Sequence, residues 1–293
     1  MTAEIYRAIV DGILIGGVYA LMAVGLTLIF GVLDIINIAQ GVLVILGAYL
    51  SYELAARLHL DLFLGLLVTV PAMFIIGVVI YWAFIRRLRG RERTAMTLLV
   101  TYAVALIIEG LLYLWWGPNF KQLNASYVNS SVHLLGFYLP YVYLYGFVLA
   151  LALVAALYAL LYRTKFGRSV RATMQDETAA RLIGIDVNRV AAVTFGVGVA
   201  VTAAGGMMYG ATSGGFNPNS GYDLISRLLA IIILGGMGSI GGALVASIFM
   251  LTVESLVDIW SPNWAIIVFY AALVIVLLIR PTGFFGRQPV RAQ

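Results

Sequence analysis

Residues 62–85 read LFLGLLVTVPAMFIIGVVIYWAFI and are followed at residues 86–93 by RRLRGRER. The first stretch carries no charged residue and is long enough to cross about 30 Å of hydrocarbon as a helix. The second stretch holds five arginines and one glutamate, which is typical of a cytoplasmic loop under the positive-inside rule. Together the two stretches predict a membrane-spanning helix that ends on the cytoplasmic side.

Apolar segments of this kind recur along the whole chain, in which 62% of the 293 residues are hydrophobic and 11% are charged. No alternating β-barrel pattern occurs, and helices satisfy their backbone hydrogen bonds internally. The predicted fold class is therefore an all-α polytopic membrane protein with about eight apolar segments. We expect residues 1–293 to form a single transmembrane domain, with the N-terminal segment retained rather than cleaved as a signal peptide.

The composition also excludes several classes of function. The net charge of +5 does not indicate nucleic-acid binding, because the basic residues cluster in short loops. Cysteine is absent, which excludes disulfides and thiol chemistry, and His59 and His133 lack the partners of a metal site. A Walker A motif is missing, since Lys121 and Lys165 precede Gln and Phe. We predict no enzyme, and no cofactor, metal or ATP bound by this chain.

The longest polar interruption is residues 163–190, RTKFGRSVRATMQDETAARLIGIDVNRV, with six of the eighteen Lys and Arg residues. Ser169 is expected to cap the start of a short helix, because its hydroxyl can accept a free backbone N–H. Gly184 is expected to end that helix in a left-handed conformation, with Ile185 folding back against it. Asp186 then caps the next membrane helix.

Between these caps, Val170, Met174 and residues 182–183 form a partial apolar stripe. A loop that only connects two membrane helices does not need this degree of local order. We interpret residues 163–190 as a surface presented to a partner protein. The alternative is a solvated surface helix.

Two apolar stretches contain glycine-bearing breaks, GVLDIINIAQG at 31–41 and GGMGSIGG at 235–242. If residues 191–211 run outward and 264–279 inward, residues 228–258 must start and finish outside, and they are too short for two straight spans. We therefore expect discontinuous or re-entrant helices near both breaks, a feature that marks the substrate path in transporters. The predicted path residues are Asn37, Gln40, Gly41, Gly235, Gly236, Gly238, Ser239 and Gly241. Alternatives are a surface loop at 37–41 and close helix packing at the glycines.

Glu109 lies well inside the predicted span 96–116, where a carboxylate is expensive. We favour a protonated or hydrogen-bonded glutamate that faces another helix. No intramembrane Lys or Arg is placed to suggest a proton relay. Residues 213–227, which include Pro218, are interpreted as a polar outer connection. Two other functions remain open: an ion-coupled secondary transporter that uses Glu109 and Asp34, and a passive channel for small neutral solutes such as urea or amides.

Three stretches carry a family resemblance: GLTLIFGVLDIINIAQG at 25–41, DETAARLIGIDVNRV at 176–190 and LLAIIILGGMGSIGGALVA at 228–246. In this order they resemble the signatures of permease subunits of branched-chain (hydrophobic) amino acid ABC importers, and the length resembles the shorter of the two permeases. The resemblance implies transport of branched-chain or other small amino acids. It also implies a second permease in a heterodimer or a homodimer, two ATP-binding subunits that hold ATP and Mg, and an extracytoplasmic substrate-binding protein.

The same resemblance gives the polar loop a role. Its residues fit the family form D-x-x-A-A-R-x-x-G-I and partly fit the general coupling motif E-A-A-x-x-x-G, with Thr178 in place of Glu. We expect a helix over 169–185 to sit in a groove on an ATPase and carry its motion into the membrane. The predicted coupling residues are Ser169, Met174, Asp176, Glu177, Ala179, Ala180, Arg181, Gly184 and Ile185. The expected location is the bacterial or archaeal plasma membrane, with the C-terminus and loops 86–93 and 163–190 in the cytoplasm.

Overall fold

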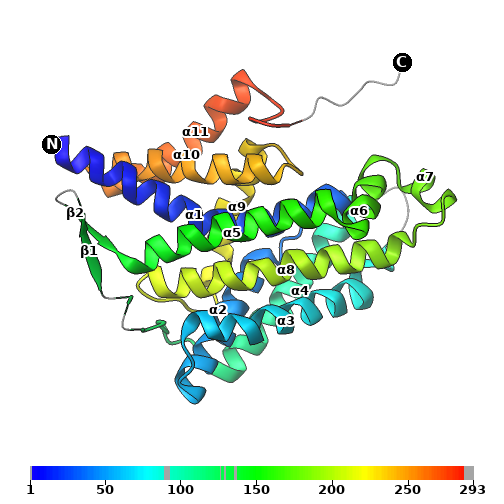
Figure 1. Ribbon diagram of the computed structural model, residues 1–293, viewed down its shortest axis with the longest axis horizontal. Helices are drawn as coiled ribbons and strands as arrows, with labels where there is room; N and C mark the ends of the chain where they lie inside the picture. The colour runs from blue at the N-terminus through cyan, green and yellow to red at the C-terminus, as the bar shows by residue number, and fades with distance from the viewer. Residues whose placement is uncertain (1, 89–92, 126, 129, 135–136, 287–293) are drawn as a thin grey trace.

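The computed structural model describes residues 2–88, 93–125, 127–128, 130–134 and 137–286 (Figure 1). The predicted loop at 86–93 therefore lies partly outside the described residues. Helices dominate, and one antiparallel hairpin pairs β1 (Ser131–Leu134) with β2 (Phe137–Pro140). The helices are α1 Thr2–Leu33, α2 Gln40–Leu58, α3 Leu62–Ile80 with a π-helical turn η1 Tyr81–Ile85, α4 Arg93–Trp116, α5 Tyr141–Arg163, α6 Lys165–Gln175, α7 Glu177–Leu182, α8 Val187–Thr212, α9 Ser220–Gly235, α10 Ile240–Asp258 and α11 Pro262–Ile279.

Eight of these helices are long and apolar enough to cross a membrane. They are α1, α2, α3 with η1, α4, α5, α8, α10 and α11. This confirms the predicted all-α polytopic class with about eight apolar segments. The shorter α9 is a further apolar helix, and it contacts the helices that follow both predicted breaks.

Small residues let the central helices approach closely. A Cβ atom on Gly12 of α1 would lie 2.5 Å from the Cα of Thr252 in α10, and one on Gly16 would lie 2.6 Å from the Cα of Ile248. In lipid no hydrophobic force drives helices together, so packing of backbones at small residues takes its place. The pairings show that α1 and α10 run antiparallel. Helix α8, the most buried span, also packs against α1, where a Cβ on Gly205 would lie 2.5 Å from Cγ of Met22.

The two ends of the bundle differ in charge. We call the end that carries Arg86, Arg87 and α6 the basic end. The end of α1 lies there, because a Cβ on Gly31 would be 3.1 Å from Cε of Met174 in α6. The C-terminal segment also reaches this end, where the Phe284 N–H donates to the Leu234 carbonyl at 2.7 Å. The N-terminus lies at the opposite end (Figure 1).

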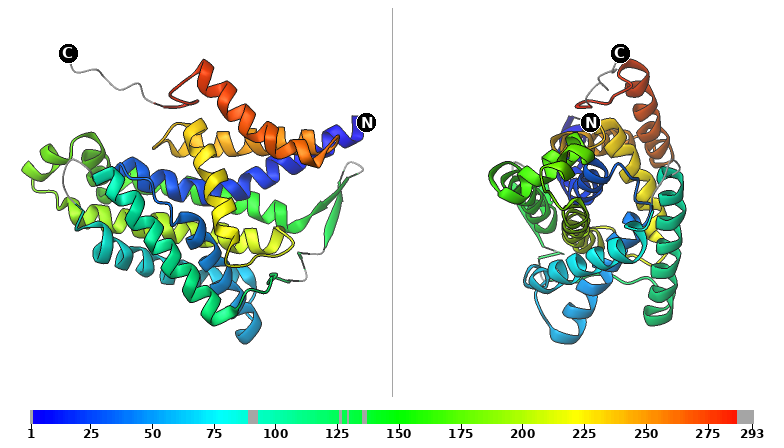
Figure 2. Two further views of the ribbon diagram at one scale, coloured as in Figure 1. Left: turned by 180° about the vertical axis from the view of Figure 1, so that it is seen from behind. Right: turned by 90° about the vertical axis from the view of Figure 1, so that its right-hand side faces the viewer.

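Both predicted breaks are present, and α9 joins them. The first is a non-helical segment between Leu33 and Gln40, and the second is residues 236–239 between α9 and α10. At its start α9 abuts α2, since a Cβ on Gly41 would overlap the Gly221 carbonyl oxygen. At its end, a Cβ on Gly235 would lie 2.5 Å from the Gly242 carbonyl carbon in α10. Figure 2 (left) shows α9, in yellow, crossing α1 and α10 steeply.

The structure corrects the predicted outer connection at 213–227. Helix α9 already begins at Ser220, so Arg227 lies within a helix rather than in a loop. The polar run NPNSGYD was interpreted as a loop because it holds Pro218 and small polar residues. The side chains of Asn217 and Ser220 instead bond each other's backbone, and these bonds begin the helix.

Candidate coupling surface and translocation region

The polar stretch at the basic end forms two short helices, α6 and α7, rather than the single helix that was predicted. Thr164 caps α6: its Oγ1 accepts from the Gly167 N–H at 3.0 Å. The prediction that Ser169 is the cap is wrong. Ser169 lies inside α6, where its Oγ donates to the Lys165 carbonyl at 3.4 Å.

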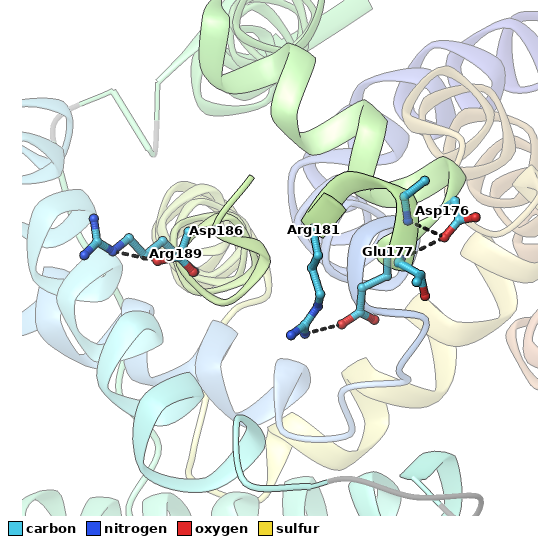
Figure 3. A network of polar contacts seen from close by, with 7 residues as sticks. Asp176, Glu177, Arg181, Asp186 and Arg189 are labelled. Carbon is cyan, nitrogen blue, oxygen red and sulfur yellow. Dashed lines mark hydrogen bonds and ion pairs between the residues drawn. The ribbon is translucent and has the colours of Figure 1, made fainter. Parts of the chain in front are cut away.

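Asp176 separates the two helices and begins the second. Its Oδ1 accepts from the Thr178 N–H at 2.7 Å and from the Ala179 N–H at 3.0 Å (Figure 3). These bonds satisfy two of the N–H groups that a helix start leaves free. The carboxylate also suits the positive end of the helix dipole.

The end of α7 matches the prediction. Gly184 has φ +86°, its N–H donates to the Arg181 carbonyl at 3.1 Å, and the Ile185 N–H donates to the Ala180 carbonyl at 3.0 Å. This pair of bonds is a Schellman motif, which favours glycine because of its left-handed residue. Asp186 then caps α8 as predicted, accepting from the Arg189 N–H at 3.1 Å.

The C-terminal end of α7 presents two large apolar side chains outward, one in its last turn and one directly after it. Leu182 is 84% exposed and Ile183 is 74% exposed, whereas Ala180 is buried. The predicted stripe is therefore split, because Val170 is fully buried on the inner side of α6 while residues 182–183 point away. A six-residue helix does not persist alone in water, so its caps and the buried Ala180 hold these side chains in place.

The inner side of α7 faces a small cavity of about 60 Å³. Its lining includes Glu177 and Arg181, which pair at 2.6 Å, and Arg86 beyond η1. A polar space therefore separates α7 from the ends of α1 and α3. The two faces of α7 differ accordingly, with a polar inner face and an apolar outer face.

Replacing Asp176 with alanine should loosen α7, since two backbone N–H groups lose their acceptor. Loss of such a cap costs about 0.5–2 kcal/mol, so amides 178–183 should exchange hydrogen up to roughly thirtyfold faster. Ser169→Ala is the matched control, because this hydroxyl caps nothing, and its effect should stay within about 0.5 kcal/mol. Equal loosening by the two variants, measured by hydrogen exchange and mass spectrometry, would contradict this assignment of the caps.

The first set of predicted path residues lies inside the protein. Asn37 and Gln40 are completely buried, the Asn37 Nδ2 donates to the Gln40 Oε1 at 3.0 Å, and the Gln40 Nε2 donates to the Thr202 Oγ1 of α8. The backbone N–H of Ile38 donates to the Thr101 Oγ1 of α4 at 3.3 Å. Non-helical backbone at this depth is tolerated only where protein satisfies it. These contacts exclude a surface loop at 37–41.

The second set of predicted path residues forms the turn between α9 and α10. Gly236 has φ +92°, a conformation that glycine adopts without steric cost. Ser239 caps α10 by accepting from the Gly242 N–H at 3.1 Å. Gly235 and Gly242 are in backbone contact, which supports close helix packing at this glycine cluster. Gly238 lies against Gly31 of α1, and Gly241 faces the Tyr158 hydroxyl.

A partly buried ion pair between two helices was missed by the sequence analysis. The Nη1 of Arg227 in α9 bonds both carboxylate oxygens of Glu254 in α10, at 2.8 and 2.7 Å, and the two side chains are only 21% and 15% exposed. The guanidinium also lies 5.3 Å from the centroid of the Phe269 ring in α11. Arg227 was predicted to lie in an outer connection, whereas in the structure it ties α9 to α10 and α11.

Glu109 is buried and hydrogen-bonded, in line with the favoured prediction. Its Oε2 accepts from the Tyr222 hydroxyl at 2.6 Å, and its exposed fraction is 9%. Tyr222 belongs to α9, so this bond is the polar link between α9 and α4. In the described part of the chain, no group of three or more His, Cys, Asp or Glu residues could hold a metal ion.

Comparison with known proteins shows which family shares this sequence. Residues 8–277 match the family model described as "Branched-chain amino acid transport system / permease component". The chain belongs to this family. It is therefore a transport permease subunit of the plasma membrane, and no catalytic function is indicated for it.

Individual relatives align over nearly the full length. The high-affinity branched-chain amino acid transport system permease protein BraD of Pseudomonas aeruginosa is 29% identical over 98% of both chains. LivH of Salmonella typhimurium, with the same description, is 29% identical over 96% of this chain and 95% of its own. The probable branched-chain amino acid transport permease protein LivH of Methanocaldococcus jannaschii is 27% identical over 96% and 92%. No solved structure matches the chain.

Proposed function

We propose that this permease carries branched-chain or other small amino acids inward, with ATP hydrolysed on two separate subunits that dock on α6 and α7. A second permease completes the passage, and an external binding protein delivers the substrate. The basic end then faces the cytoplasm, in agreement with the positive-inside rule, and the N-terminus faces outward. Family membership and the substrate named for the aligned relatives support this assignment.

The observation that carries the proposal is the geometry of α7. Leu182 and Ile183 are exposed beyond the basic end, where water rather than lipid would surround them. Exposed apolar area costs about 25 cal/mol per Å² relative to buried area. A partner that covers these side chains recovers that free energy. Because α7 is capped at both ends, it forms a short rigid element. It can therefore transmit a displacement of the ATP-binding subunit to α6 and α8.

Replacing Leu182 with aspartate tests this docking surface. A charge on the apolar outer face should weaken binding of the ATP-binding subunit by about 1.4 kcal/mol or more, or tenfold in affinity. Leu58→Asp is the control, because Leu58 is also an exposed leucine, 62% exposed, but lies at the end of α2. Co-purification of the subunits from detergent measures both variants. Undiminished binding by Leu182→Asp would contradict the proposed docking.

A further inference from the structure

One face of α9 carries polar side chains that nothing covers. Asp223 and Ser226 are exposed and Tyr222 is half-buried, whereas Leu224, Ile225 and Leu228 on the other side of the helix are buried. Asp223 forms no hydrogen bond or ion pair with any residue that the structure describes. We call Tyr222, Asp223 and Ser226 the open face of α9.

The open face lies within the length of the membrane-spanning helices. Gly221 abuts Gly41, and the adjacent Gln40 bonds Thr202 in α8. Helix α8 runs from Val187 at the basic end to Thr212. At 1.5 Å per residue, Thr202 lies about 15 Å from the end of α8 at Thr212. Ser220 and Asp223 also interact with Tyr209, three residues before Thr212, so the start of α9 lies between the level of Thr202 and the end of α8 at Thr212.

Contact with lipid would be unfavourable for the polar side chains of the open face. Acidic side chains at the bilayer centre are costly, rare, and face the bundle interior or a water-filled cavity. Asp223 is exposed, and the group of its own bundle that it affects is the Tyr209 hydroxyl of α8, with which it forms no hydrogen bond. Water or a second protein must therefore lie beside it.

The helices on either side of the open face show where on the molecule this face lies. Helix α4 lies on one side, linked through the 2.6 Å bond between Tyr222 and Glu109. Helix α11 lies on the other, where the Arg227 guanidinium packs over Phe269. Figure 2 (right) shows α9 between α4 and α11. Helix α11 is the least buried of the spans, so this side of the chain has few internal contacts and is suited to a second permease.

We propose that the open face of α9 lines the water-filled passage between this chain and the second permease, and that the Asp223 carboxylate contacts the ammonium group of the transported amino acid. The inference rests on the proposed function and adds to it the residues that meet the substrate. A zwitterionic substrate needs an anionic partner when it leaves bulk water, because an unpaired charge is expensive at this depth. The hydroxyls of Ser226 and Tyr222 supply neutral hydrogen-bonding groups beside it.

The absence of cysteine from this chain allows a direct test. Ser226→Cys in the complete importer is expected to be labelled by a membrane-impermeant methanethiosulfonate reagent, because a thiol reacts as the thiolate, which forms in water. Ile75→Cys is the control, since Ile75 is 61% exposed in the middle of α3 on an apolar surface, and it should stay unlabelled. Leucine or valine should slow labelling of Ser226→Cys. Labelling no faster than that of Ile75→Cys would overturn the proposal.

Asp223→Asn tests the contact with the ammonium group. Loss of a charge-assisted hydrogen bond should lower the apparent affinity for leucine roughly tenfold or more, while the amount of assembled complex stays unchanged. Unchanged affinity would overturn the role of Asp223. Absence of uptake by the unaltered importer would instead contradict the proposed function, and labelling of Ser226→Cys would still report whether the face is wet.

Discussion

Gly41→Val should strongly destabilise this protein where α2 packs against α9. A Cβ at position 41 would overlap the carbonyl oxygen of Gly221. Both residues lie in helices that cross in backbone contact, so the overlap cannot be relieved by a side-chain rotation. Overpacking a close-packed interior typically costs 1–3 kcal/mol, and occasionally more. Here neither backbone can move without disturbing Gln40 and its bond to Thr202. We expect a cost of about 3 kcal/mol or more, which lowers the melting temperature by roughly 6 °C or more.

Gly110→Val is the matched control for this substitution. Gly110 also lies in a membrane helix, but no atom lies within 4 Å of a Cβ placed there. Both variants add the same β-branched side chain to a helix, so the intrinsic propensity terms are similar. Thermal unfolding of the purified chain in detergent measures the difference. A Gly41→Val protein as stable as Gly110→Val would show that α2 and α9 do not cross in backbone contact.

Glu254→Gln should destabilise the chain strongly, because it leaves the Arg227 charge buried without its counterion. Breaking a buried ion pair by removing one partner costs about 3–5 kcal/mol. Removing both charges is far less costly, since the desolvation penalty disappears with them. The double variant Arg227→Met with Glu254→Leu should therefore regain most of the lost stability. A double-mutant cycle on the free energy of unfolding measures the coupling.

An exposed pair within the same chain provides the comparison. Arg7 and Asp11 lie 3.6 Å apart with 62% and 32% of their side chains exposed, and such pairs contribute about 0–1 kcal/mol. Arg7→Met should therefore change stability by less than about 1 kcal/mol. If Glu254→Gln lowers the free energy of unfolding no more than Arg7→Met does, the pair between α9 and α10 is solvated. That result would contradict its placement between the helices.

Local chemistry made part of this structure predictable from sequence. The apolar spans follow from length and composition, and the end of α7 at Gly184 follows from the requirement for a left-handed residue. Asp186 was identified as a cap because its position directly precedes an apolar run. The break at Gln40 was found because an amide inside an apolar stretch is unusual. Each of these features depends on residues close together in the chain.

The remaining features depend on contacts between distant residues. Ser169 was predicted to cap the helix, but α6 begins at Lys165, directly after α5, so that Thr164 is the cap. Arg227 pairs with Glu254 across 27 positions, and Tyr222 pairs with Glu109 across 113. Nothing in the local pattern marks these partners. Residues 213–227 were interpreted as a polar outer connection, whereas Arg227 lies in α9 beside its counterion Glu254.

Uptake into proteoliposomes tests the central claim most directly. The chain is reconstituted with its second permease, the ATP-binding subunits and the binding protein, and accumulation of labelled leucine is followed with and without ATP. We expect accumulation only in the complete assembly with ATP, and its loss with Leu182→Asp. Accumulation of leucine by this chain alone, driven by an ion gradient, would contradict the account.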